Sequence, residues 1–461
     1  MNKKKIGFIA GILVAVIIML LPLSNSGLSH EGQLCLALSL MTVVFWAMNV
    51  AQSGFVGGVY LALLIILKVA TPDVVFKAWY GSSTMWLVIG AYMIAAAVKD
   101  SGLGERIAYG FIKKFVRSYN SIIISIFVLT FILSLLIPHP WPRAFLIMAV
   151  MSVVIKSADI PKEDAVKIGF TVFAASVPVS LIFLTGDSVI NPLAASYATD
   201  MEITFLKWFA YMGPPAIIAS VITCILILIL FKPSKKVEIN IAAIEQKQKE
   251  LGKMSELEIR TLVWLIIAVV LWLTDSIHGI NVGWVTMIIA MLMSMPVIGE
   301  VLTVKSWSNV PVHVLVFLTS AMAIGSVGGV TGMNEWLATT ILPATLPSNL
   351  FVFALLLAVV AIIVHMFMGS VIAVMGVLIP SLLIATGNMG VPMIVVALLV
   401  YMAIASHYIL PFHHLNMLVG QGEENGMYTQ KETIKLGIPL TVVVFVLALV
   451  CVAWWKIIGL C

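Results

Sequence analysis

The chain has 461 residues, of which 61% are hydrophobic and only 10% are charged, with a mean hydropathy of +1.12 and a formal net charge of +5. Such a composition indicates an integral membrane protein built mostly from spanning helices. We attribute the small positive charge to cytoplasmic loops, which excludes nucleic acid as a partner. The four cysteines lie in or beside apolar runs without metal-ligand spacing, so no disulfide framework is predicted.

Residues 1–30 are predicted to contain an N-terminal spanning helix. A lysine-rich start is followed by the apolar run 6–21. This run is long, and no small-x-small cleavage site follows it, so we interpret it as a membrane span and not as a signal peptide. The lysines place the N-terminus in the cytoplasm.

Three further spans are predicted near 32–49, 53–69 and 83–98, because about 20 apolar residues cross a bilayer core. The next segment, 102–118, alternates apolar and basic residues and is predicted to lie in the cytoplasmic membrane interface. Its counterpart later in the chain, 330–347, contains no lysine or arginine. The two segments are therefore expected on opposite sides of the membrane.

The apolar stretch 120–156 is predicted to form a re-entrant hairpin. Three alternate prolines interrupt it at 138–142, and proline prevents continuous helical hydrogen bonding. A broken span follows, with its break at 185–192, and a further span ends near Phe231. The segment 232–260 mixes lysines with glutamates and is interpreted as a cytoplasmic linker.

The second half is predicted to repeat this order. Spans are expected near 261–275, 282–298 and 312–328, before a hairpin at 349–386 with its kink at 368–370. A span broken near 411–416 and a last span complete the chain. Each half then has five crossings plus a hairpin, and an odd number of crossings inverts the second half. The fold class is all-α, with about eleven transmembrane helices and an extracytoplasmic C-terminus.

Repeated residues support this division. Trp46, Gly57 and Val59 recur at one constant spacing as Trp272, Gly283 and Val285. We therefore predict two inverted repeats, 31–231 and 261–461, an arrangement that favours a transporter.

In such folds the substrate lies near the membrane midplane between broken helices, whose free backbone groups bind ions and anions. Non-helical backbone at this depth is stable only where it is buried in protein or lines a water-filled cavity, so the four breaks are expected to lie close together. The expected substrate-binding residues are Pro138, His139, Pro140, Arg143, Asn191, Gly369, Ser370, Val371, His413, His414 and Asn416; the expected ion-coupling residues are Thr185, Gly186, Asp187 and Ser188.

Arg143 is the most informative single residue, because an unpaired guanidinium at membrane depth costs about 2.5–3.5 kcal/mol. Its partner is either Asp187 or an anionic substrate that it grips bidentately. His139, His413 and His414 could donate hydrogen bonds to a carboxylate or carry a coupling proton. No metal site is predicted, because His407, His413 and His414 have no carboxylate or thiolate nearby. The remaining histidines, His30, His278, His313 and His365, are interpreted as peripheral or packing residues.

The chain resembles the divalent anion:sodium symporter family over nearly its whole length. The similar segments are 102–108 after the fourth span, Asn191-Pro192 in the first break, 410–416 in the second break and 437–439 in the last helix. The resemblance implies a homodimer in the cell (inner) membrane, in which an elevator-like domain carries di- or tricarboxylates or sulfate. It also implies sodium as the coupling ion and no other cofactor.

The hairpin tips depart from that family's Ser-Asn-Thr motif. The matching positions here are 138–140, Pro-His-Pro, and 370–372, Ser-Val-Ile. Proton coupling or anion exchange without sodium, or an anion channel, therefore remain alternatives. An aspartyl enzyme using Asp187 and Asp275 is not predicted, because Asp275 aligns with Asn49 in the repeat and no hydrolase motif occurs.

Overall fold

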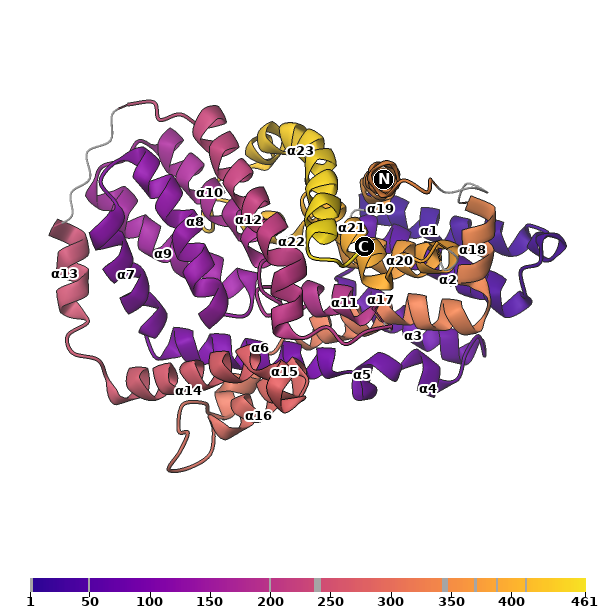
Figure 1. Cartoon of the computed structure of the whole chain (residues 1–461), viewed down its shortest axis with the longest axis horizontal. Helices are drawn as coiled ribbons and strands as arrows, with labels where there is room; N and C mark the ends of the chain where they lie inside the picture. The colour runs from indigo at the N-terminus through magenta and orange to yellow at the C-terminus, as the bar shows by residue number, and fades with distance from the viewer. Residues whose placement is uncertain are drawn as a thin grey trace.

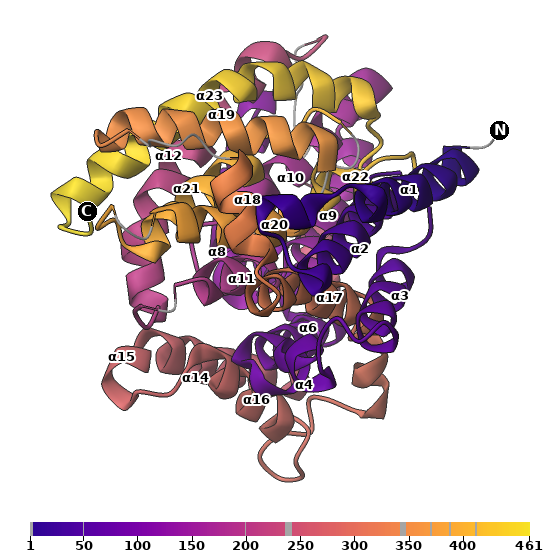
Figure 2. The same ribbon diagram turned by 90° about the vertical axis from the view of Figure 1, so that its right-hand side faces the viewer.

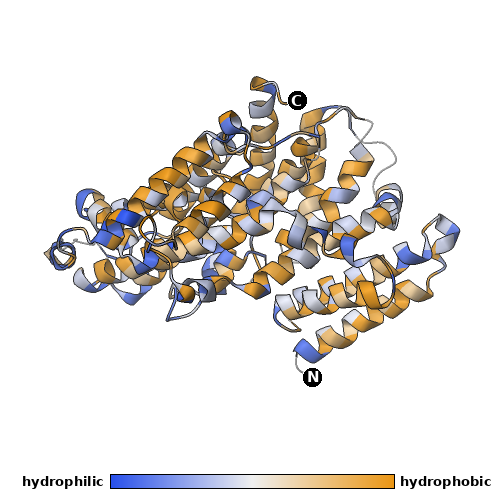
Figure 3. Cartoon of the chain, turned by 90° about the horizontal axis from the view of Figure 1, so that it is seen from below, coloured by the Kyte–Doolittle hydropathy of each residue, from blue (hydrophilic) through white to orange (hydrophobic). Residues whose placement is uncertain are grey.

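The computed structural model describes residues 3–48, 50–198, 200–235, 242–341, 347–368, 371–386, 389–410 and 413–461. Regular structure in these ranges is helical, apart from an isolated bridge between Gln421 and Tyr428. The all-α class is thus confirmed. Hydrophobic residues cover most of the helices, and hydrophilic residues gather mainly at helix ends and connections (Figure 3).

The first half contains helices that run up to the charged linker (Figure 1). They are α1 (Lys3–Leu20), η1 (Leu23–Ser26), α2 (His30–Ala47), α3 (Ser53–Ile66), α4 (Pro72–Val75), α5 (Lys77–Gly81), α6 (Ser83–Asp100), α7 (Leu103–Phe115), α8 (Tyr119–Leu136), α9 (Pro140–Ser157), α10 (Lys162–Ser180), α11 (Ile190–Ser196) and α12 (Phe205–Leu230).

The linker helix follows (Figure 1), and the second half comes after it (Figure 2). These helices are α13 (Ala242–Glu250), α14 (Glu256–Leu273), α15 (Asp275–His278), α16 (Val282–Leu292), η2 (Val304–Asn309), α17 (Val312–Val330), α18 (Met333–Ile341), α19 (Leu350–Met368), α20 (Val371–Thr386), α21 (Met393–Ala405), α22 (Leu415–Val419) and α23 (Gln430–Ile457).

Three helix interruptions overlap predicted breaks but begin one to five residues earlier, and the last residues of each of these predicted breaks are helical. The first hairpin breaks at 137–139, and Pro140 occupies the first turn of α9, where its missing N–H costs nothing. The first broken span is interrupted at 181–189 and the second at 406–414. The predicted kink around Met368, Gly369 and Ser370 falls at the α19–α20 junction, where residues 369–370 lie outside the described residues, as do 411–412 in the second break.

Five described helices are long and apolar enough to cross a membrane: α8, α12, α17, α19 and α23. The count becomes six if α6 and α7, which meet at a 65° bend, form one span. About eleven full-length spans are therefore not confirmed. The span predicted at 282–298 is shorter than expected, because α16 ends at Leu292 and rises only about 16 Å. The chain then turns through a segment containing Pro296.

The two halves interlock through close helix crossings. Helix α3 packs on α17, and α16 packs on α6. A Cβ at Gly57 would lie 2.4 Å from the Ser320 hydroxyl, and one at Gly283 would lie 2.2 Å from the Ser83 carbonyl. Only glycine allows helices to approach so closely, so these two repeated glycines are explained by packing.

The linker is anchored to α7 by Arg106. Its guanidinium donates to both carboxylate oxygens of Glu258, at 2.6 and 3.0 Å, and to the carbonyl oxygens of Leu251 and Gly252, at 3.0 and 2.9 Å. The predicted linker is therefore partly folded: it contains α13, and α14 already begins at Glu256.

We predict that Glu258→Gln lowers the free energy of unfolding by about 1–3 kcal/mol at pH 7, because it removes the charge-assisted bonds from Arg106. The Arg106 guanidinium holds the pKa of Glu258 below its ordinary value of 4.5. A lowered folded-state pKa stabilises the protein above the unfolded pKa, and this stabilisation is lost as pH falls through the folded value. The difference in unfolding free energy between Glu258→Gln and wild type should therefore disappear when unfolding is measured at acidic pH.

Glu245→Gln, which breaks an exposed pair with Lys113, is the control and should change stability little. Equal stability of Glu258→Gln and wild type at pH 7 would contradict the assignment.

Candidate functional site

A cavity of about 230 Å³ lies where the interrupted helices meet. Its wall combines the first hairpin tip, the break at 181–189, the start of α20 and the segment 413–418 with residues of α2, α6 and α17. The predicted site residues that line it are His139, Pro140, Asp187, Val371, His413, His414 and Asn416.

The other predicted site residues lie outside this lining. Pro138, Arg143, Asn191, Thr185, Gly186 and Ser188 are not part of the cavity wall. Gly369 and Ser370 are outside the described residues. Sequence reasoning missed a set of wall residues contributed by the helices that pack around the tips. They are Trp46, Tyr92, Trp141, His313 and Phe317.

His139 caps α9 and contacts Tyr92 at the first tip. Its Nδ1 accepts a hydrogen bond from the Trp141 backbone N–H at 3.2 Å, and its Nε2 lies 2.7 Å from the Tyr92 hydroxyl. Since Nδ1 accepts, a neutral ring carries its hydrogen on Nε2 and donates it to Tyr92. Both nitrogens are thus engaged in this conformation.

Asn416 links the second break to the first hairpin. Its Oδ1 accepts a hydrogen bond from the Trp141 indole at 2.6 Å, and its backbone N–H is capped by His414 Nδ1 at 3.4 Å. Asn416 is 3% exposed, and its Nδ2 has no hydrogen-bond partner among the described residues. Asn416 therefore contributes a buried amide donor to a mostly aromatic and apolar cavity wall.

Arg143 is fully buried and joins the tip to the first break. It donates to the carbonyl oxygens of Ile137 at 3.0 Å and Gly186 at 3.2 Å, and to the Ser180 hydroxyl at 2.5 Å. The described residues contain no ion pair between Arg143 and a carboxylate. Asp187 instead caps α11, accepting hydrogen bonds from the backbone N–H groups of Val189 and Ile190.

The first break is further held by Asn191. Its Nδ2 donates to the carbonyl oxygens of Ser180 and Phe183, and its Oδ1 accepts from the Tyr401 hydroxyl at 2.5 Å. Two hydroxyls of the same break, Thr185 Oγ1 and Ser188 Oγ, are completely buried without a hydrogen-bond partner in the described ranges. Their oxygen atoms are therefore available as ligands for a cation.

A second cavity of about 660 Å³ lies beyond the first break. Leu184 and Pro192 line it, together with Lys77, Glu202 and residues at the beginnings of α6 and α16. Because Asp187, Val189 and Ile190 line the smaller cavity, the segment 184–192 contributes to both.

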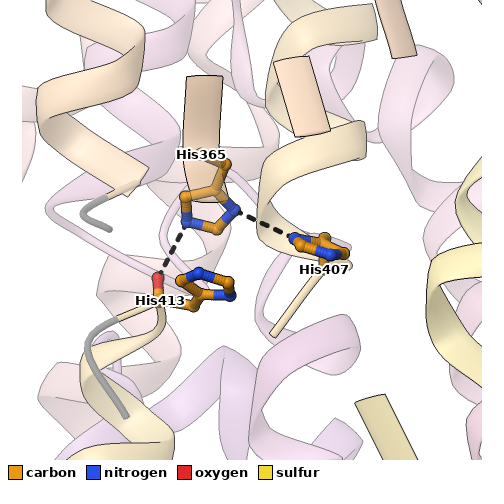
Figure 4. A group of neighbouring side chains, drawn as sticks. All are labelled: His365, His407 and His413. Carbon is orange, nitrogen blue, oxygen red and sulfur yellow. Dashed lines mark hydrogen bonds between the residues drawn. The ribbon is translucent and has the colours of Figure 1, made fainter. Parts of the chain in front are cut away.

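Three histidines gather behind the second break (Figure 4). His365 from α19, His407 from the segment after α21, and His413 are all fully buried. One ring nitrogen from each lies within 4.8 Å of those of the others. His365 was interpreted as a packing residue, because a single histidine in an apolar helix carries no sequence signal of its partners.

Residues 2–461 match the family described as the sodium:sulfate symporter transmembrane region. The chain belongs to this family, the divalent anion:sodium symporters. The resemblance noted from the sequence is thereby confirmed, and the chain is a membrane transporter of anions.

Several similar proteins are named as transporters. A putative malate transporter, YflS of Bacillus subtilis, is 26% identical over 60% of this chain and 60% of its own length. The chloroplastic dicarboxylate transporter 1 of Spinacia oleracea is 26% identical over 59% of this chain and 49% of its own length. The matches thus span less than two thirds of each of these relatives. The crystal structure of the YdaH transporter of Alcanivorax borkumensis has a similar fold, with a TM-score of 0.55 at 13% identity, covering 94% of this chain and 99% of that one.

We predict that Arg143→Lys reduces anion uptake by at least about tenfold, because one ammonium group cannot hold the three acceptors that the planar guanidinium bridges. Uptake into proteoliposomes and the melting temperature of the purified protein are the measurements. Arg117→Lys is the matched control, since Arg117 bonds to exposed carbonyls at the end of α7. If Arg143→Lys takes up anions as fast as wild type, the guanidinium has no part in transport.

Proposed function

We propose that this protein is a secondary active transporter of dicarboxylates that is coupled to sodium and works by an elevator-type alternating-access mechanism. The observation that carries the proposal is the cavity between the first hairpin tip and the two broken spans. Family membership supports an anionic cargo, and the names of the malate and dicarboxylate transporters among its relatives support a dicarboxylate.

Inverted repeats are part of the proposal, and the packing of corresponding helices supports them. At the spacing that separates Trp46 from Trp272, α3 corresponds to α16 and α6 corresponds to α17. The crossings of α3 on α17 and of α16 on α6 exchange corresponding helices of the two halves. This reciprocity is what a two-fold axis in the membrane plane produces.

The chemistry of the cavity suits a carboxylate. The Asn416 amide offers an unused N–H donor and His414 lies in the same wall, whereas both ring nitrogens of His139 are engaged by Tyr92 and Trp141. In a site that excludes most water, a few such donors bind anion oxygens strongly, while aromatic walls fit the carbon chain between two carboxylates.

Sodium binding is proposed at the first break. Hard cations prefer oxygen ligands, and unwound segments supply them through backbone carbonyls. The buried hydroxyls of Thr185 and Ser188 are available there, whereas the Gly186 carbonyl already accepts from Arg143. This site does not use the family's Ser-Asn-Thr tips, which the chain lacks.

Alternating access is supported by the two cavities that share the segment 184–192. We place the smaller cavity towards the cytoplasm and the larger one towards the outside, in accordance with a cytoplasmic N-terminus and an extracytoplasmic C-terminus. A homodimer would supply the fixed scaffold past which the site moves.

The test is uptake of labelled malate, succinate, citrate and sulfate into proteoliposomes. Each anion is offered with an inward sodium gradient, a proton gradient, or unlabelled anion inside. Sodium-driven uptake of a dicarboxylate is expected. Uptake driven only by protons or counter-anion would reject sodium coupling, and gradient-independent flux would indicate a channel.

We predict that Asn416→Asp raises the KM for the dicarboxylate by at least about tenfold. The substitution preserves the size of the side chain and the acceptor for Trp141, but it places a negative charge where the anion binds. Asn309→Asp, on an exposed 3₁₀ turn, is the control and should transport as wild type. If the KM of Asn416→Asp equals that of wild type, the anion does not bind against this part of the cavity wall.

We further predict that Ser188→Ala raises the sodium concentration for half-maximal uptake at least about fivefold, because it removes an oxygen ligand. Ser176→Ala is the matched control, since the Ser176 hydroxyl is buried but already donates to the Phe173 carbonyl. Identical sodium dependence of both variants would place the ion elsewhere.

A further inference from the structure

Among the described residues at the junction between the second hairpin and the second break, no charged side chain is comparable to Arg143. In the first half, that guanidinium ties the tip at Ile137 to the break at Gly186. Helix α20, which follows the second tip, has no basic or acidic residue. The corresponding junction is instead occupied by His365, His407 and His413 (Figure 4).

The spacing of two of these rings matches shared metal coordination better than a hydrogen bond. His407 Nδ1 and His365 Nδ1 lie 3.4 Å apart. Donor and acceptor nitrogens in a good hydrogen bond lie about 2.7–3.2 Å apart. Two nitrogens that each lie about 2.0–2.1 Å from one tetrahedral zinc ion are separated by about 3.4 Å.

The second nitrogen of His365 is engaged as in a metal ligand. His365 Nε2 lies 3.1 Å from the His413 carbonyl oxygen, so its N–H is donated there and the lone pair of its Nδ1 faces His407 Nδ1. Histidine ligands of metals usually donate their second nitrogen to a carbonyl in this way. His407 is fully buried, and its Nε2 has no hydrogen-bond partner in the described part of the chain.

His413 provides the third ring and the connection to the cavity. Its ring is nearly parallel to that of His365, at 27° with centroids 4.6 Å apart. Its Nδ1 accepts hydrogen bonds from the backbone N–H groups of Ile409 and Leu410, so Nε2 is the nitrogen that would serve as the ligand. Because His413 lines the smaller cavity, water from there can fill the fourth position.

We propose that His365, His407 and His413 bind one divalent transition-metal ion of the zinc class, which ties α19 to the segment 406–414. Three imidazoles without a carboxylate favour Zn²⁺, Co²⁺, Ni²⁺ or Cu²⁺ over Mg²⁺ and Ca²⁺. The ion would do in the second half what the Arg143 guanidinium does in the first. This site is independent of the identity of the cargo.

The experiment titrates tag-free, chelator-treated full-length protein with Co²⁺. One ion per chain should bind, with the visible absorption of tetrahedral cobalt, and Zn²⁺ should displace it and raise the melting temperature. His365→Gln and His407→Gln should weaken binding at least about tenfold. His30→Gln and His278→Gln, which remove histidines distant from the cluster in the chain, are the controls and should bind as wild type.

If a glutamine variant fails to fold, His407→Cys provides a second test, because its thiolate replaces the imidazole as a metal ligand. It should still bind cobalt and add a sulfur-to-cobalt charge-transfer band. No saturable binding by wild type, or equal binding by wild type, His365→Gln and His407→Gln, would overturn the proposal and leave a hydrogen-bonded histidine cluster. Anion uptake is measured separately, so a failure of the proposed transport function would not affect this result.

Discussion

The constraint on which the site depends is the hydrogen-bonding demand of backbone that leaves its helix inside a membrane. Every freed carbonyl and N–H there must find a partner in the protein or in a watery cavity. In this chain the partners are side chains placed at the breaks: Arg143 and Asn191 hold carbonyls, while His139, Asp187 and His414 cap new helix starts. The cavity exists because these groups keep the breaks open.

Those same interactions decide which side chains are available to a ligand. Arg143 carries a full charge, yet its terminal nitrogens donate to Ile137, Gly186 and Ser180, and it does not line the cavity. Its buried Nε has no partner in the described ranges. Among the described wall residues, the neutral Asn416 keeps an amide donor without a partner. An anion would thus be held by neutral hydrogen-bond donors, an arrangement that avoids a permanent ion pair and favours release.

The sequence was sufficient to predict the helix breaks, because proline positions and interrupted apolar runs are local signals. It also identified seven residues of the cavity wall. It could not find Tyr92 or Phe317, because an aromatic residue in an apolar helix looks the same whether it faces lipid, a neighbour or a cavity. Span lengths were overestimated for the same reason: hydropathy continues past Leu292, whereas the helix does not. The sites of ion coupling, the repeats and the dimer remain predictions.

The difference between the halves follows from how each break can be stabilised. A guanidinium bridges several acceptors from one residue, so in the first half Arg143 alone ties the tip at Ile137 to the break at Gly186. The second half has imidazoles at the equivalent junction, and a neutral ring can donate only one hydrogen. Among the described residues, the three rings are joined by the long contact between His407 and His365 and by the bond from His365 to the His413 carbonyl. A cation bound between the rings would use the Nδ1 lone pairs of His365 and His407, which face each other across 3.4 Å, and the cluster would then act as a ligand set.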